Sequence, residues 1–124
     1  MNRDMDVVRQ IVLALRDATG QLQSLPDVPD EVFKYNAQLL IEEGLALGYS
    51  ASGGMSGNGI VPAVLFLNRL TWDGHDFADS IASDTIWKSA KDKVIKPTAS
   101  WTFAILKEFL KAEIKRHLGM PDGG

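Results

Sequence analysis

Residues 39–75 read LLIEEGLALGYSASGGMSGNGIVPAVLFLNRLTWDGH, and the spacing of their apolar side chains changes along the segment. A helical pattern ends at Gly44, and large apolar residues then occupy every second position. The large side chains that alternate as in a half-buried strand are Leu45, Leu47 and Tyr49. Residues 50–59 are rich in glycine and serine, and a second strand is predicted over about residues 60–69. The segment therefore predicts a helix followed by a β-hairpin with a flexible tip.

A first helix is predicted ahead of this segment, over about residues 4–19. Asp4 is suited to cap its start, and Gly20 is expected to end it in the left-handed conformation. One arc carries apolar residues at helical spacing, namely Val7, Val8, Ile11, Val12, Leu15 and Ala18. Residues 20–29 contain two prolines, which predicts a loop or one short edge strand.

A second helix is predicted to start within residues 27–30 and to continue to Glu43, where Gly44 stops it. Its expected buried side consists of Val32, Phe33, Ala37, Leu39, Leu40 and Ile41, with Asn36 as a polar exception. Its outward stripe consists of Glu31, Lys34, Tyr35, Gln38 and Glu42.

A third helix is predicted to follow the hairpin directly. Thr71 is expected to be its N-cap, and Gly74 is expected to permit a close approach to the preceding strand. Phe77 and Ile81 then form the buried face of this helix.

Two more helices are predicted in the last third of the chain. One covers about residues 83–96, is capped by one of its first two residues and is ended by Pro97. The other covers about residues 100–118 and is stopped by Gly119 and Pro121.

The last of these helices carries apolar residues over more than half of its circumference. They are Trp101, Phe103, Ile105, Leu106, Phe109, Leu110, Ala112 and Ile114. Lys107, Lys111 and Lys115 occupy the remaining stripe. Because so wide an arc implies burial on two sides, we expect a homodimer that forms through this C-terminal helix.

The order of elements resembles that of winged-helix transcription factors, in which a recognition helix precedes a hairpin wing and a Leu-Thr-x-x-Gly helix start. The closer resemblance covers nearly the whole chain and is to an uncharacterised bacterial and phage family, domain of unknown function 2513. The motifs that carry it are Met5-Asp6-x-Val8-Arg9, Leu39-Leu40-Ile41-Glu42-x-Gly44-Leu45, Arg69-Leu70-Thr71-Trp72-x-Gly74-His75-x-Phe77, Asp84-Thr85-x-Trp87-Lys88 and Leu118-Gly119. This resemblance implies a winged-helix fold and frequent carriage on prophages, and no activity comes with the family name.

The predicted fold class is therefore α+β, mainly α. A winged-helix-like core with a two-stranded β-hairpin wing is expected over residues 1–82, and a two-helix extension packed on that core is expected over residues 83–124. At 124 residues the two parts are expected to form a single structural domain.

Charge is distributed unevenly between these two parts. Residues 1–82 hold five Lys or Arg against eleven Asp or Glu, whereas residues 83–124 hold eight against five. The chain has no cysteine, which excludes disulfides, thiol nucleophiles and thiolate zinc sites. Its charged start and its longest apolar run of eight residues are unlike a signal peptide or a membrane span, so a cytoplasmic protein is expected.

No constellation in the sequence predicts an enzyme, a cofactor or a metal site. The glycine-rich tip lacks the Gly-Lys-Ser/Thr ending of a phosphate-binding loop. His75 and Asp79 have i,i+4 spacing, but two candidate ligands do not make a metal site. Of the tryptophans, Trp72 and Trp87 are expected in core packing, and Trp101 is expected to be the most exposed.

Two functions remain open for a non-enzymatic winged-helix protein. The first is DNA binding or transcription regulation of a phage or prophage type, and the alternative is a protein–protein interaction module, such as a phage protein that engages a host or phage factor. The residues expected to contact DNA or a partner are Lys34, Tyr35, Gln38, Asn58, Lys107, Lys111 and Lys115. The acidic outward stripe of the second helix favours the alternative, because phosphate contacts need positive groups.

Overall fold

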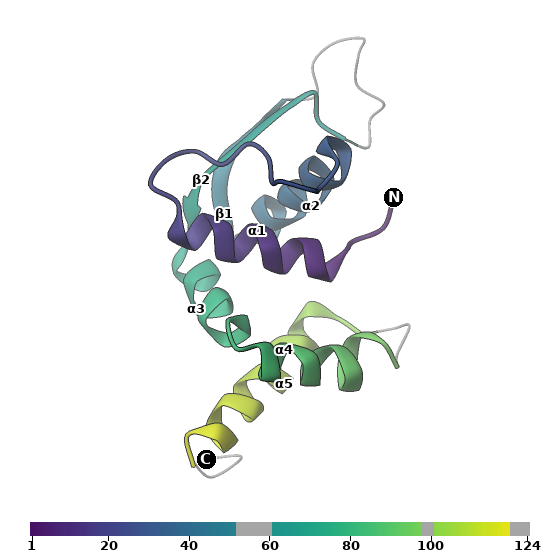
Figure 1. Cartoon of the computed structure of the whole chain (residues 1–124), viewed down its shortest axis with the longest axis vertical. Coiled ribbons are helices and arrows are strands. Elements are labelled where there is room, and N and C mark those ends of the chain that lie inside the picture. The colour runs from purple at the N-terminus through teal and green to yellow at the C-terminus, as the bar shows by residue number, and fades with distance from the viewer. Residues whose placement is uncertain (52–60, 98–100, 120–124) are drawn as a thin grey trace. The chain divides into compact units, whose positions relative to one another are not determined.

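The computed structural model describes residues 1–51, 61–97 and 101–119, and it is α+β and mainly helical (Figure 1). The predicted fold class is confirmed. The chain divides into two compact units, Met1–Ala78 and Asp79–Gly124, and the division falls inside helix α3 (Trp72–Ile81). The expectation that both parts form one structural domain stays a prediction.

Helix α1 (Met5–Asp17) begins where the sequence predicts. The carboxylate of Asp4 accepts hydrogen bonds from the amides of Asp6 and Val7 at 3.1 and 3.2 Å. The apolar arc is buried, with Met5 added to it: Met5, Val7, Val8, Ile11, Val12 and Leu15.

The predicted end of this helix is wrong by two residues. Ala18 already has extended backbone, with φ −74° and ψ 145°, and Gly20 is not left-handed. The chain extends here because Leu22 pairs with Leu67 through two backbone hydrogen bonds of 2.9 Å. The short edge pairing that residues 20–29 suggested is therefore present at this one bridge.

Helix α2 (Asp30–Glu42) ends as predicted, with Gly44 in the left-handed conformation at φ 78°. The amide of Leu45 donates to the carbonyl of Leu40 across this end at 2.9 Å. The buried side is narrower than predicted and consists of Phe33, Asn36, Ala37 and Leu40. Val32, Leu39 and Ile41 are only half-buried.

The hairpin consists of β1 (Ala46–Ala51) and β2 (Val64–Leu70), which pair antiparallel. The second strand begins later than predicted. Ile60 lies outside the described residues, and residues 61–63 precede the strand. Pro62 cannot donate a hydrogen bond to a β-ladder, which is consistent with this late start.

The expectation that Leu47 and Tyr49 lie on the buried side of the strand is wrong. Their side chains are 44% and 52% exposed. The register changes between Leu47 and Gly48, and the buried leucines of β2 face the small residues of β1 instead. These pairs are Ala46 with Leu70, Gly48 with Leu67 and Ser50 with Leu65. The large side chains of β1, Leu47 and Tyr49, therefore lie on the outer side of the hairpin, and Ala46 is the buried residue of the strand.

Helix α3 begins as predicted. The hydroxyl of Thr71 accepts from the amide of Gly74 at 3.0 Å and donates to the carbonyl of Gly44 at 2.6 Å. A Cβ atom at Gly74 would lie 3.1 Å from the Cβ atom of Leu70, so the predicted close approach to the preceding strand is present. The tightest overlap would be with the carbonyl oxygen of Leu45, the residue before β1. Phe77 is buried as predicted.

The second unit contains the end of α3 with buried Ile81, helix α4 (Asp84–Ala90) and helix α5 (Phe103–His117). The hydroxyl of Ser83 caps α4. The helix continues as one π-helical stretch, η2 (Lys91–Ile95), before Pro97.

Helix α5 begins three residues later than predicted, because Thr102 is its N-cap and accepts from the amide of Ile105 at 3.2 Å. Ser100 lies outside the described residues, as does Pro121. The end at Gly119, with φ 74°, is as predicted. Among the helices of the described residues, none has the length and apolarity to cross a membrane.

Candidate interaction surfaces

Lys34 is the one cation on the outward stripe of α2, and its ammonium group is already bound. It donates to the carbonyl of Ala63 at 2.8 Å and pairs with the carboxylate of Asp30 at 3.1 Å. Its side chain is only 19% exposed. This cation therefore ties α2 to the segment that leads into β2.

The other residues of the N-terminal unit that were predicted to contact DNA or a partner are Tyr35, Gln38 and Asn58. Tyr35 and Gln38 are half-buried, and the side-chain oxygen of Gln38 is shielded from solvent without a hydrogen-bond partner in the described structure. Asn58 lies outside the described residues. The exposed charges of α2 and its end are all carboxylates, from Asp30, Glu31, Glu42 and Glu43.

Asn36 is the polar exception predicted on the buried side of α2, and it is completely buried. Its side-chain oxygen accepts from the amide of Asp4 at 2.9 Å, and its side-chain nitrogen donates to the carbonyl of Val32 at 2.9 Å. Asn36 therefore joins the start of α1 to α2. Its role is structural, since both ends of its amide are occupied within the unit.

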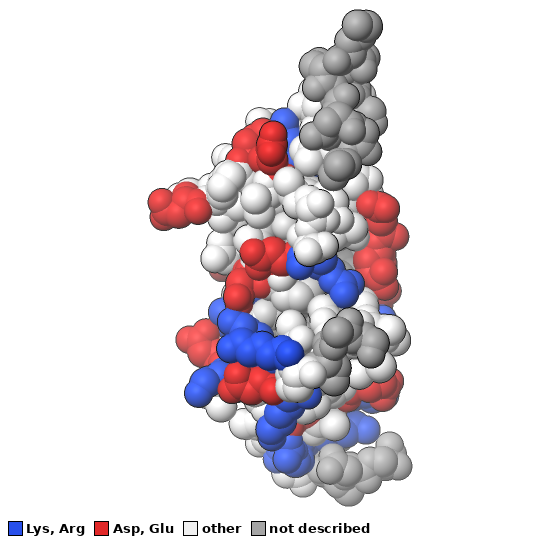
Figure 2. All heavy atoms as spheres, turned by 90° about the vertical axis from the view of Figure 1, so that its right-hand side faces the viewer, with Lys and Arg blue, Asp and Glu red and all other residues white. Residues whose placement is uncertain are grey.

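The predicted lysine stripe of α5 is present on the second unit. Lys107 and Lys111 are exposed and Lys115 is half-buried. The ammonium of Lys107 lies 5.1 Å from the centre of the Phe103 ring, a cation–π contact that leaves the group near the surface. Figure 2 shows Lys and Arg side chains interspersed with Asp and Glu side chains on the face that it draws.

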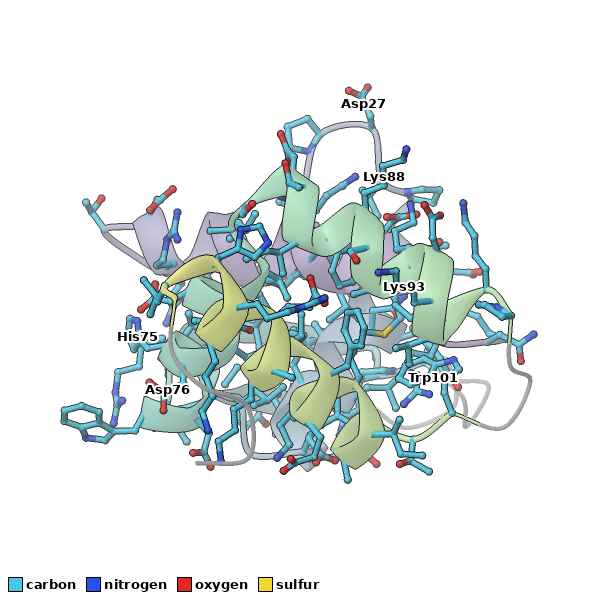
Figure 3. The ribbon with its side chains drawn as sticks, turned by 90° about the horizontal axis from the view of Figure 1, so that it is seen from below. Asp27, His75, Asp76, Lys88, Lys93 and Trp101 are labelled. Atoms are coloured by element: carbon cyan, nitrogen blue, oxygen red, sulfur yellow. The ribbon has the colours of Figure 1, made fainter. Side chains whose placement is uncertain are left out.

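Helix α4 and its π-helical continuation add further lysines to this unit. Lys88 and Lys93 are both exposed (Figure 3). Lys96 pairs with Asp92 at 3.6 Å, one turn earlier on the same helix. The second unit therefore carries exposed lysines on two helical segments.

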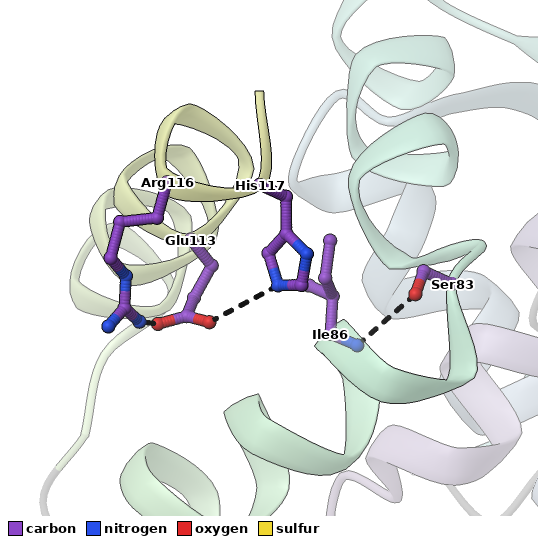
Figure 4. Close-up of polar contacts among 5 residues, drawn as sticks. All are labelled: Ser83, Ile86, Glu113, Arg116 and His117. Atoms are coloured by element: carbon purple, nitrogen blue, oxygen red, sulfur yellow. Dashed lines mark hydrogen bonds and ion pairs between the residues drawn. The ribbon is translucent and has the colours of Figure 1, made fainter. Parts of the chain in front are cut away.

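The buried side of α5 contains a carboxylate that the sequence reasoning missed. Glu113 is 5% exposed and lies on the same face as Leu106 and Leu110. Its carboxylate forms an ion pair with the guanidinium group of Arg116 on the same helix (Figure 4). The other oxygen of this carboxylate, Oε2, lies 3.9 Å from the Nε2 atom of His117. Glu113 follows Leu110 by three residues, and this helical spacing could have predicted that both lie on the buried face.

The outer face of the hairpin presents apolar side chains, which we call the hairpin patch: Leu47, Tyr49, Val64 and Phe66. Val64 is 50% exposed, and the rings of Tyr49 and Phe66 stack with their centres 5.5 Å apart. The two aromatic residues are also paired in the strand register. Sequence reasoning missed this patch because it placed Leu47 and Tyr49 on the inner side.

Two of the three tryptophan predictions are wrong. Trp72 is 88% exposed, because it is the first residue of α3 and lies on the opposite side of the helix from Ile81. Trp101 is half-buried (Figure 3). Trp87 is buried as predicted.

His75 and Asp76 lie exposed on α3 (Figure 3), and Asp79 is exposed on the same helix. Across the described residues, no group of three or more His, Asp or Glu side chains is arranged to hold a metal ion.

The amino-acid sequence was compared with protein families and with known proteins. Residues 2–100 match the model of a family described as "Hypothetical protein (DUF2513)". The chain belongs to the DUF2513 family. An uncharacterized protein of Haemophilus influenzae is 32% identical over 127 residues, which cover 95% of this chain and 99% of the relative. No solved structure matches the chain. The resemblance to DUF2513 is thus confirmed, and neither description assigns the family a ligand or an activity.

Proposed function

We propose that this DUF2513 protein is a non-enzymatic interaction module with a winged-helix-like core, whose N-terminal unit binds a protein and not DNA. One observation carries the proposal. The only cation on the outward stripe of the described α2 is held by Asp30 and by the carbonyl of Ala63. A base or phosphate contact by Lys34 would first have to break both interactions.

The charge of the N-terminal unit supports the same proposal. Residues 1–78 hold five Lys or Arg against ten Asp or Glu. Affinity for DNA comes largely from cations that replace the counterions of the phosphate backbone. The exposed carboxylates of Glu31, Glu42 and Glu43 would instead repel it. A protein partner with a basic surface fits this unit better, because complementary charge favours encounter.

The first test addresses the acidic end of α2. Proteins that the chain captures from an extract of the cells that encode it would be purified, and their affinity for the chain would be measured by calorimetry. We expect Glu42→Lys to lower the affinity of the chain for such a partner by on the order of tenfold. Glu108→Lys, which changes an exposed carboxylate of α5 by the same charge, is the matched control and should leave the affinity unchanged. Equal effects of both variants would contradict a partner site on α2.

A second candidate function is DNA binding of the phage or prophage regulatory type through the lysine-bearing helices of the C-terminal unit. The exposure of Lys88, Lys93, Lys107 and Lys111 favours it. These cations belong to helices outside the winged-helix-like core, so contact with the phosphate backbone would supply most of the binding.

A mobility-shift assay with mixed genomic fragments at two salt concentrations separates the two candidates. We expect no salt-sensitive shift at micromolar protein. A shift that Lys107→Glu with Lys111→Glu abolishes would support the second candidate. A shift that Lys34→Met abolishes would contradict the proposal for the N-terminal unit.

A further inference from the structure

Trp72 is the most exposed large apolar side chain among the described residues, at 88%. Its ring adds little to the core, because the buried side of α3 is formed by Phe77 and Ile81. Among the described residues, the indole has no stacking or cation–π partner. Tryptophan is enriched among the residues that contribute most to protein interfaces. The exposed ring therefore indicates contact with another molecule.

The fold brings the acidic end of α2 to the start of α3. The hydroxyl of Thr71 donates to the carbonyl of Gly44 at 2.6 Å, and its amide donates to the carbonyl of Leu45 at 3.0 Å. Glu43 directly precedes Gly44, and Trp72 directly follows Thr71. The exposed carboxylates at the end of α2 and the exposed ring thus belong to one small region of the N-terminal unit.

The carboxylates of Glu42 and Glu43 stand where a helix favours cations. The C-terminal end of a helix carries partial negative charge, which disfavours acidic side chains. The last turn of α2 contains no basic residue, and neither carboxylate has an ion-pair partner among the described residues. Asp73, in contrast, is accounted for by the positive N-terminal end of α3. A cation supplied by another molecule would relieve the repulsion at the end of α2.

Asp76 provides a further carboxylate beside the exposed ring. It follows Trp72 by four residues on α3 and is exposed (Figure 3). Side chains four residues apart on a helix are neighbours, with Cβ atoms about 5–6 Å apart. They also lean toward the helix N-terminus, so Asp76 extends toward Trp72. A cation placed over the indole is therefore within reach of this carboxylate.

We propose that this region, the junction surface of Glu42, Glu43, Trp72 and Asp76, binds an arginine side chain of a partner protein. Its guanidinium group stacks on the indole of Trp72 and pairs with the carboxylates around it. Arginine fits better than lysine, because a planar guanidinium stacks on a ring and forms two parallel hydrogen bonds to a carboxylate. The inference rests on the proposed function, since it names the chemistry of the basic partner. The net negative charge of the unit attracts such a partner and repels a second copy of the unit.

The first test uses a short peptide that repeats Leu-Arg-Gly as the probe, titrated into the isotopically labelled full chain. The chain has three tryptophans, and NMR resolves the N–H signal of each indole. We expect the signal of Trp72 to move and those of Trp87 and Trp101 to stay. A peptide that repeats Leu-Lys-Gly should bind about threefold more weakly. An unmoved Trp72 signal, or equal affinity for the two peptides, would overturn the proposal.

Two pairs of variants locate the site by calorimetry with the arginine peptide. Trp72→Ala should raise the dissociation constant about tenfold, whereas Tyr49→Ala, which removes an exposed ring of the hairpin patch, should leave it unchanged. Glu43→Gln should raise it about threefold, whereas Glu31→Gln, at the opposite end of α2, should not. Glu43→Gln should not lower the stability of the chain, because it removes an unfavourable charge. Equal effects within either pair would overturn the proposal.

The captured partner separates this inference from the proposed function. A partner whose affinity falls with both Glu42→Lys and Trp72→Ala supports both. A fall with Glu42→Lys alone would overturn the arginine site and leave a protein partner on α2 standing. A partner insensitive to both variants would contradict the proposed function, and the peptide titration would still decide the arginine site. Self-association that Trp72→Ala abolishes would overturn the inference in favour of a lysine of a second copy.

Discussion

The two units of the molecule differ in charge and in how they use it. The N-terminal unit is acidic, and its cation Lys34 serves to hold α2 to the segment before β2. The C-terminal unit is basic, with exposed lysines on α4, η2 and α5, and among its described residues it buries the carboxylate of Glu113, which pairs with Arg116. The helix to which the winged-helix resemblance would assign DNA contact is therefore on the acidic unit. A shared order of elements does not carry a shared function.

The largest effect is expected from a substitution that destabilises the core of one unit, which tests whether the two units unfold separately. Phe33→Ala removes a completely buried side chain from the N-terminal unit and should lower its stability by about 3–5 kcal/mol. Urea denaturation would measure the loss, and native-state hydrogen exchange would locate it. We expect faster exchange in α1 and α2 and little change in α5. Equal loss of protection in both units would show that they unfold together and would remove the basis of the comparison.

A smaller effect is expected from the buried amide that joins α1 to α2. Asn36→Leu keeps a similar volume but leaves the amide of Asp4 without its side-chain acceptor and removes the side-chain donor to the carbonyl of Val32. We expect a loss of about 1–3 kcal/mol in thermal or urea unfolding. Asn68→Leu, at an exposed position of β2, is the control: its side-chain oxygen accepts one exposed hydrogen bond, from the side-chain amide of Gln21 at 3.3 Å, so its loss should cost less than about 1 kcal/mol. Similar losses in both variants would argue against a special role for Asn36.

The two threonine caps allow a direct comparison between the units. Thr71→Ala and Thr102→Ala each remove a hydroxyl that accepts from a helix amide, with an expected cost of about 1 kcal/mol. The cost should be greater at Thr71, because its hydroxyl also donates to the carbonyl of Gly44. Paired urea titrations would measure the difference. A larger loss at Thr102 would contradict this account of the junction between α2 and α3.

The smallest effect on stability is expected on the lysine surface. Lys111→Glu alters an exposed side chain of α5 and should change the free energy of unfolding by less than about 0.5 kcal/mol. It should also reduce the salt concentration needed to elute the chain from heparin, because a polyanion contacts this surface by charge. Lys34→Met should leave the elution unchanged. If Lys34→Met lowered the elution salt concentration and Lys111→Glu did not, the accessible cation would lie on the N-terminal unit.

Local signals in the sequence predicted the parts of the fold that depend on a few adjacent residues. Asp4, Ser83 and Thr71 cap their helices, and Gly44 and Gly119 end theirs, because capping involves groups within one turn. The family was also recognisable from short motifs.

Features that depend on distant partners were not predictable in this way. The outward direction of Leu47 and Tyr49 follows from the register with β2, which the alternation of apolar residues in one strand cannot specify. The early end of α1 follows from the bridge between Leu22 and Leu67.

The candidate site shows the same division. The acidic character of α2 was evident from composition, but the commitment of Lys34 to Ala63 joins residues 29 positions apart. The exposure of Trp72 was accessible in principle, since a helical wheel of α3 places it opposite Ile81.

The most direct test of the central claim is an NMR titration of the isotopically labelled full chain with duplex DNA at low and moderate salt. The account predicts that the amides of Lys34, Tyr35 and Gln38 on α2 keep their chemical shifts throughout. Any salt-sensitive change should be confined to the lysine-bearing helices of the C-terminal unit. Salt-sensitive shifts at those three residues of α2 would contradict the claim that the N-terminal unit binds protein and not DNA.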